Sequence, residues 1–196
     1  MTFATTVDRW VDGIARSRVP DPVVDRLHAA VDRLPDRVRS RLQGDWLGIP
    51  LHPILTDVTI GAWTGSFVAD LVGGRDARAF SQRLILLGNL SALPTVASGL
   101  ADWSRLDREG RRVGVVHATS NLAATFLYAR SYRARRRGSH GRGVAWGLAA
   151  ATVATVGGHL GGMLVYRYAG GVERVPEQLR GCPPAPSFAS ESLRIG

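Results

Sequence analysis

Two of the five histidines lie within long apolar stretches of the sequence, where an ionisable side chain is costly to bury, and a third directly precedes such a stretch. They are His52, His117 and His159, and each is surrounded mainly by small and aliphatic residues. A neutral imidazole can ligate haem iron or another metal, carry a proton, or hydrogen-bond to a neighbouring helix. Met163 follows one helical turn after His159, and its thioether can also ligate haem iron.

The longest uncharged stretch, residues 144–166, indicates the setting of these groups. Its length of about 23 residues is that of a helix crossing the hydrocarbon core of a bilayer. Small residues recur on one of its faces: Ala150, Ala154, Gly158 and Gly162, with Gly157 and Gly161 beside them. Because small residues let membrane helices approach closely, we interpret the stretch as a transmembrane helix whose small-residue face packs against its neighbours.

Three further apolar stretches have about the length of a membrane span: residues 53–72, 84–101 and 113–129. Polar segments that contain several arginines separate them. The sequence therefore predicts an all-α fold: a four-helix transmembrane bundle with both chain ends on one side, preceded by N-terminal amphipathic helices. We expect residues 46–172 to form this membrane domain and residues 173–196 to form an irregular C-terminal tail.

Residues 1–45 have the pattern of an amphipathic helical N-terminal region, with apolar residues at helical spacing and Asp and Arg on the opposite faces. Pro35 is expected to break the second of these helices. Two placements are open. The helices lie on the membrane surface with their arginines at the headgroups, or they form a small cap that packs on itself or on the loops.

The chain carries 25 basic residues, all of them arginine, and its net charge is +9 at pH 7. Beside four apolar spans, we expect this charge to interact with anionic membrane lipids and not with nucleic acid. The expected location is the inner or plasma membrane, which the chain crosses several times. The excess of arginines at the span ends near the termini is small, and we expect cytoplasmic termini because a charged segment of about 45 residues without a signal is difficult to export.

Spans that alternate in direction bring most of the ionisable and polar groups to one side of the membrane. This cluster comprises His52, Asp57, Asp102, His117, Asn121, His159 and Met163. Asp57 shares a helix face with Gly61 and Gly65, so we expect it to point into the bundle. His117 and Asn121 share a polar stripe, which we expect to turn away from lipid.

One interpretation of the cluster is a buried site for a metal, for haem b or for a proton relay. His117 with either His159 or Met163 is then the expected pair of haem ligands. The other interpretation is structural, because the same side chains can hydrogen-bond between helices and hold the bundle together. The sequence has no Gly-x-Ser-x-Gly, Cys-x-x-Cys or His-Glu-x-x-His motif, which favours a protein that is not an enzyme.

Four blocks of sequence carry a resemblance to a known family. They are residues 46–53 (WLGIPLHP) with Asp57 and Gly61 after them, residues 98–103 (SGLADW), Arg112 with His117 and Asn121, and residues 160–167 (LGGMLVYR). Over residues 46–172 the chain resembles the bacterial membrane-protein family named domain of unknown function 2231. The resemblance implies a four-helix membrane domain, which in some members is joined to a Rieske-type iron–sulfur domain or a cytochrome domain. That family often has a histidine where Ile49 and Met163 stand in this chain.

The residues and the resemblance together suggest an integral membrane protein that is redox-associated, through haem or metal binding, or an accessory membrane subunit. Its expected partners are membrane lipids, with a membrane redox partner or a second copy of the chain as further candidates. Two other functions stay open. One is a non-catalytic scaffold whose small-residue faces bind other helices, and the other is a small transporter or proton relay that uses Asp57 and the histidines.

Overall fold

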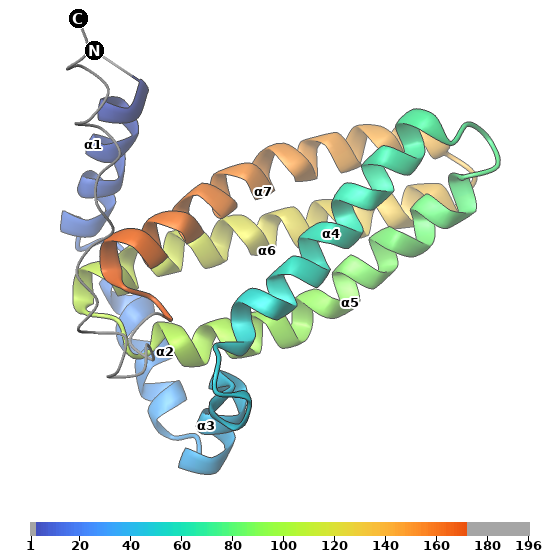
Figure 1. Cartoon of the computed structure of the whole chain (residues 1–196). Coiled ribbons are helices and arrows are strands. Elements are labelled where there is room, and N and C mark those ends of the chain that lie inside the picture. Colours follow the sequence, from blue (N-terminus) through green and yellow to red (C-terminus); the bar gives the residue numbers. More distant parts are fainter. Residues whose placement is uncertain (1–2, 172–196) are drawn as a thin grey trace, which may run out of the picture.

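The computed structural model describes residues 3–171, and the predicted tail at 173–196 lies outside the described residues. Within them the chain is all-α and has no strand (Figure 1). Three short helices come first: α1 (Phe3–Arg16), α2 (Asp21–Asp32) and α3 (Asp36–Gln43), with a 3-10 turn at Asp45–Leu47 after them. Four long helices follow: α4 (Leu51–Val72), α5 (Arg78–Trp103), α6 (Arg108–Arg136) and α7 (His140–Tyr168).

Each long helix contains one of the four predicted apolar stretches and extends it into polar sequence. The largest extension is in α6, which was predicted at 113–129 and begins instead at Arg108. The carboxylate of Asp107 caps this start by accepting a hydrogen bond from the Gly110 amide at 2.7 Å. At the other end α6 continues to Arg136. Hydropathy marks only the apolar middle of a helix, which is why the charged ends were missed.

The four long helices form two hairpins, α4 with α5 and α6 with α7, which pack together along α5 and α6 (Figure 1). The outer pair, α4 and α7, make little contact with each other. Trp63 of α4 and Tyr128 of α6 stack with ring centroids 4.3 Å apart. These rings share a buried cluster with Ile85 of α5 and Ala150 of α7, so all four long helices contribute to one core.

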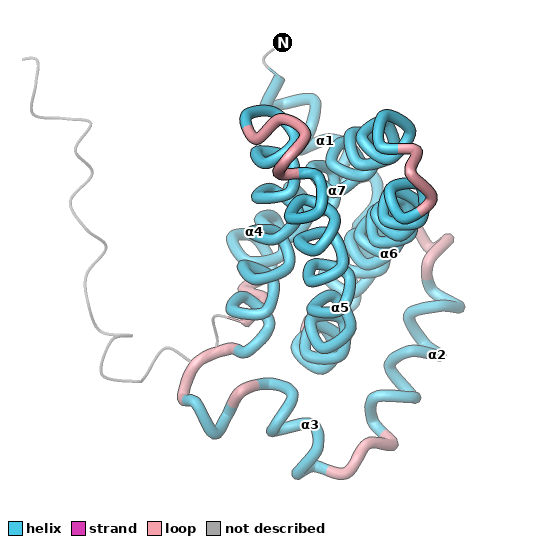
Figure 2. The backbone as a smooth tube through the Cα atoms, turned by 90° about the vertical axis from the view of Figure 1, so that its right-hand side faces the viewer, coloured by secondary structure: helices cyan, strands magenta, loops and turns pink. Residues whose placement is uncertain are grey.

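The short helices pack against the end of the hairpins where α5 ends and α6 begins (Figures 1 and 2). Arg112 of α6 forms a bidentate ion pair with Asp21 at 2.7 and 2.9 Å, and it also donates to the Ala15 carbonyl at 2.9 Å. The hydrogen bonds from this guanidinium lower the pKa of Asp21 to about 2. Gln43 of α3 is buried and donates to the Ala101 carbonyl at 2.9 Å. The N-terminal helices therefore form a cap on this end.

A proline divides the cap, as the sequence predicted. Helix α2 ends at Asp32, and α3 begins directly after Pro35, which confirms the expected break. Val24 of α2 is buried against Trp103 and Leu106. The cap is thus fixed by apolar contacts as well as by ion pairs.

Two of the four long helices, α5 and α7, are long and apolar enough to cross a membrane by length and composition. Helices α4 and α6 do not pass this test, and both carry polar or ionisable residues within their apolar stretches, Asp57 and Asp70 in α4 and His117 and Asn121 in α6. Only 33% of the most apolar stretch of α5 and 17% of that of α7 are buried within the protein. A core helix of a water-soluble protein would be mostly buried, so both helices present apolar side chains outward.

Candidate functional site

His52 stands at the start of α4 and joins it to α5. Its ring Nδ1 lies 2.9 Å from the Thr95 carbonyl oxygen. A carbonyl oxygen only accepts, so Nδ1 carries a proton, and in the neutral ring Nε2 then has a lone pair. The ring lies against the backbone of Gly99, where a Cβ atom would come within 2.6 Å of the imidazole. Because Gly99 has no side chain, the imidazole ring of His52 can pack directly against its backbone.

His117 makes the same kind of contact between α6 and α7. Its Nδ1 donates to the Gly157 carbonyl at 2.8 Å, and its ring lies against Gly161, where a Cβ would come within 3.0 Å. The side-chain amide nitrogen of Asn121 lies beside the ring, 3.3 Å from each ring nitrogen, and donates to the His117 carbonyl at 3.1 Å. A Cβ at Gly157 would come within 2.5 Å of the Asn121 Oδ1 atom. Two glycines of α7 thus make space for the polar side chains of α6.

The two histidines occupy equivalent places in two similarly built hairpins. Each donates to a carbonyl of the next helix and covers a glycine one turn further along that helix. Each is followed at the same spacing by a buried aromatic (Trp63, Tyr128), a buried serine (Ser66, Ser131) and a charged residue (Asp70, Arg135). Matching residues of α4 and α6 are 65 positions apart, as Asp70 and Arg135 are.

A buried ion pair closes the opposite end of the hairpins. Arg135 binds both carboxylate oxygens of Asp70, at 2.6 and 2.8 Å, and their side chains are only 3% and 7% exposed. Arg135 also donates to the Ser81 hydroxyl at 3.0 Å, and the His140 ring lies 3.7 Å from Asp70. The sequence interpretation missed this pair because it placed Arg135 in a polar loop. The correspondence between α4 and α6, which pairs His52 with His117, also pairs Asp70 with Arg135, and it is the sequence signal that could have revealed this ion pair.

Two residues of the predicted cluster lie elsewhere, because Asp57 and His159 are exposed on the outer faces of α4 and α7. The expectation that Asp57 points inward beside Gly61 is wrong, since a Cβ at Gly61 would meet nothing within 4 Å. A Cβ at Gly158 or Gly162 would likewise meet nothing within 4 Å, so the predicted packing face of α7 is wrong at these two positions, while Ala150 and the flanking Gly157 and Gly161 are covered by neighbouring residues. The physical reason is the arrangement of the hairpins, in which α4 and α7 make little contact. His117 and His159 consequently do not share a ligand site.

The remaining predicted residues belong to the contact zone between the long helices and the cap. Met163 packs against the buried cluster that contains Val11, Val113 and Leu160. Asp102, at the end of α5, lines a hollow together with residues of the α5–α6 turn and Tyr168. Among residues 3–171 there is no group of three or more His, Cys, Asp or Glu that could hold a metal ion. The geometry therefore leaves His52 and His117, with Asn121 beside His117, as the candidate functional residues.

An all-α chain with two helices, α5 and α7, that are long and apolar enough to span a membrane, and with histidines and an ion pair between its helices, has features of a helical membrane protein. The chain belongs to the family described as predicted membrane protein (DUF2231), which matches residues 48–174. The suspected family is thereby confirmed. Comparison with curated proteins and with solved structures returned no match.

Proposed function

We propose that α4–α7 form a four-helix transmembrane bundle of a multi-pass protein in the inner or plasma membrane. Large apolar side chains are exposed on the outer faces of all four helices, among them Leu71 at 67%, Leu93 at 68%, Leu122 at 66% and Leu148 at 47%. A surface of this kind is unfavourable in water and is covered by lipid in a bilayer. Several polar residues of α4 and α6 lie between the helices, as His117, Asp70 and Arg135 do, whereas Asp57 lies on the outer face.

Within this bundle we infer a redox-associated accessory role, in which His52 and His117 ligate a metal centre. The observation that carries this proposal is that both Nδ1–H groups are donated to backbone carbonyls, at 2.9 and 2.8 Å, so both Nε2 atoms have a lone pair. Histidines that bind metals are commonly oriented by such a bond. Two imidazoles without further ligands suit haem b better than a bare ion, because the porphyrin supplies the other nitrogen ligands.

A second candidate is a non-catalytic scaffold subunit. It is favoured by the Asn121 amide, which lies 3.3 Å from Nε2 of His117, and by the packing of both rings on glycine. In that role each imidazole only bridges two helices, with a contribution of about 0.6–2 kcal/mol per hydrogen bond. A proton relay through Asp57 is not favoured, because Asp57 lies on the outer face of α4.

The visible absorption spectrum of the full chain, expressed with haem supplied and purified in mild detergent, separates these candidates. A haem ligand pair predicts a Soret band that is lost in the His52→Ala and His117→Ala variants. His159→Ala is the matched control, because this histidine is exposed and should leave the band unchanged. Circular dichroism of each variant establishes that its helices are formed. A wild-type protein with neither a Soret band nor bound metal would overturn the ligand role and support the scaffold.

A further inference from the structure

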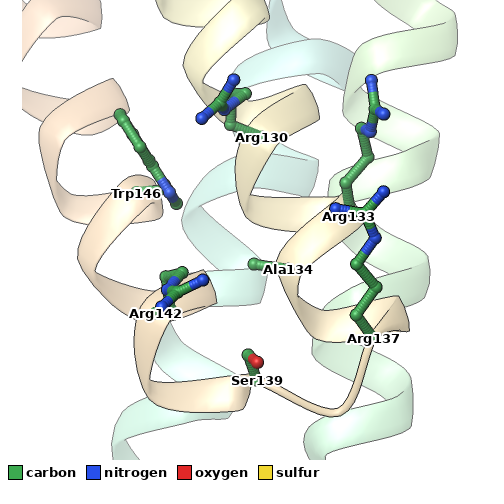
Figure 3. Close-up of a pocket in the computed structure, with 7 residues that line it drawn as sticks. All are labelled: Arg130, Arg133, Ala134, Arg137, Ser139, Arg142 and Trp146. Carbon is green, nitrogen blue, oxygen red and sulfur yellow. The ribbon is translucent and has the colours of Figure 1, made fainter.

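A basic hollow lies beside the turn between α6 and α7, at the end of the hairpins that holds the Asp70–Arg135 pair. Its volume is about 180 Å³. Its lining consists of Arg130, Arg133, Ala134, Arg137, Ser139, Arg142 and Trp146 (Figure 3). Figure 3 shows Trp146 and Arg142 on one side, Arg133 and Arg137 on the other, and Ala134 between them. Four arginine residues thus line one small space.

These four arginines lack acidic partners among the described residues. The buried carboxylate at this end, Asp70, is already bound by Arg135. The guanidinium of Arg130 instead lies 5.0 Å from the centroid of the Trp146 ring. Four like charges around one hollow repel one another. An anion bound between them would remove that repulsion.

The first hairpin supplies an internal comparison, because it is built like the second. Matching residues of α5 and α7 are 62 positions apart, as Thr95 and Gly157 are. With this offset, and the offset of 65 for α4 and α6, the positions that match the hollow in the first hairpin are apolar: Gly65, Val68, Val72, Phe80 and Leu84 stand in place of Arg130, Arg133, Arg137, Arg142 and Trp146. A hairpin of this form therefore does not require arginine at these places. The charge of the hollow is a property of the second hairpin alone, as expected for a binding site.

We propose that this hollow binds the phosphate group of an anionic phospholipid. Guanidinium groups bind phosphate oxygens through paired hydrogen bonds. The hollow also lies where α6 and α7 leave the membrane in the proposed bundle, which is the level of the headgroups, and tryptophan is typical of that level. This assignment to a lipid rests on the proposed membrane crossing of α6 and α7. The same phosphate chemistry is offered by free phosphate, so the test must separate the two sources.

The test is native mass spectrometry of the full chain in detergent, with phosphatidylglycerol, phosphatidylcholine or inorganic phosphate added. We expect wild-type protein to retain one phosphatidylglycerol at least five-fold more often than phosphatidylcholine. The double variant Arg130→Gln/Arg142→Gln should lose this preference. The matched control is Arg75→Gln/Arg136→Gln, which removes the same charge from exposed residues outside the hollow and should behave like wild type.

Equal retention of phosphatidylglycerol by the two double variants would overturn the proposal, because binding would then follow net charge. Retention of inorganic phosphate without a preference for phosphatidylglycerol would also overturn it, because the occupant would not be a lipid. Failure of the proposed membrane crossing has a different readout, since sodium carbonate would then extract the chain from membranes. Failure of the histidine site would change only the visible spectrum.

Discussion

Arg135→Ala is expected to destabilise the protein by about 3–5 kcal/mol, because it leaves the Asp70 carboxylate buried without its partner. Asp70→Ala should destabilise the protein by a similar amount, because it leaves the Arg135 guanidinium buried without its partner. The double variant Asp70→Leu/Arg135→Met should recover much of the loss, since it removes both charges and keeps apolar side chains in their place.

Thermal unfolding in one detergent, followed by circular dichroism, measures these effects. Arg136→Ala serves as the control, because Arg136 is the exposed neighbour of Arg135 and its loss should leave the melting temperature nearly unchanged. If Arg135→Ala and Arg136→Ala had the same melting temperature, the buried ion pair would not contribute to stability. A double variant less stable than both single variants would equally contradict the account.

Gly157→Ala is expected to destabilise the protein by about 1–3 kcal/mol, while Gly158→Ala should be neutral or slightly stabilising. The added Cβ at Gly157 would come within 2.5 Å of the Asn121 Oδ1 atom and would disturb the contact with His117. The added Cβ at Gly158 would meet nothing within 4 Å. These adjacent glycines therefore differ only in the face of α7 that they occupy.

The same unfolding assay compares the two alanine variants directly. The account expects a lower melting temperature for Gly157→Ala and an unchanged or higher one for Gly158→Ala. The reverse order would show that the face predicted from the sequence, through Gly158 and Gly162, is the packed one. It would also remove the basis for the inward orientation of His117.

The sequence was sufficient to place the four long helices and the break at Pro35, because hydropathy and proline act locally. It was not sufficient to choose the packed face of a helix that carries small residues on two adjacent faces. Gly157 and Gly158 differ by one position, and only the neighbouring helix decides which of them is covered. The same ambiguity led to the wrong orientation of Asp57.

A comparison of the two halves of the sequence would have resolved much of this ambiguity. The position of α6 that matches Asp57 is Leu122, which is 66% exposed, and the position of α5 that matches His159 is Ala97, which is also exposed. The same comparison pairs His52 with His117. The length of α6 is harder to foresee, because burial of Arg135 depends on a carboxylate from α4.

The central claim is that lipid covers the outer faces of α4–α7, and cysteine labelling of intact cells tests it most directly. In a Cys182→Ser background, single cysteines replace Phe126 on the outer face of α6, Arg75 in the α4–α5 turn and Arg105 in the α5–α6 turn. A membrane-impermeant maleimide should leave the cysteine at 126 unlabelled and should reach those at 75 and 105 from opposite sides of the membrane. Rapid labelling at 126, or labelling at 75 and 105 from the same side, would contradict the four-helix transmembrane bundle.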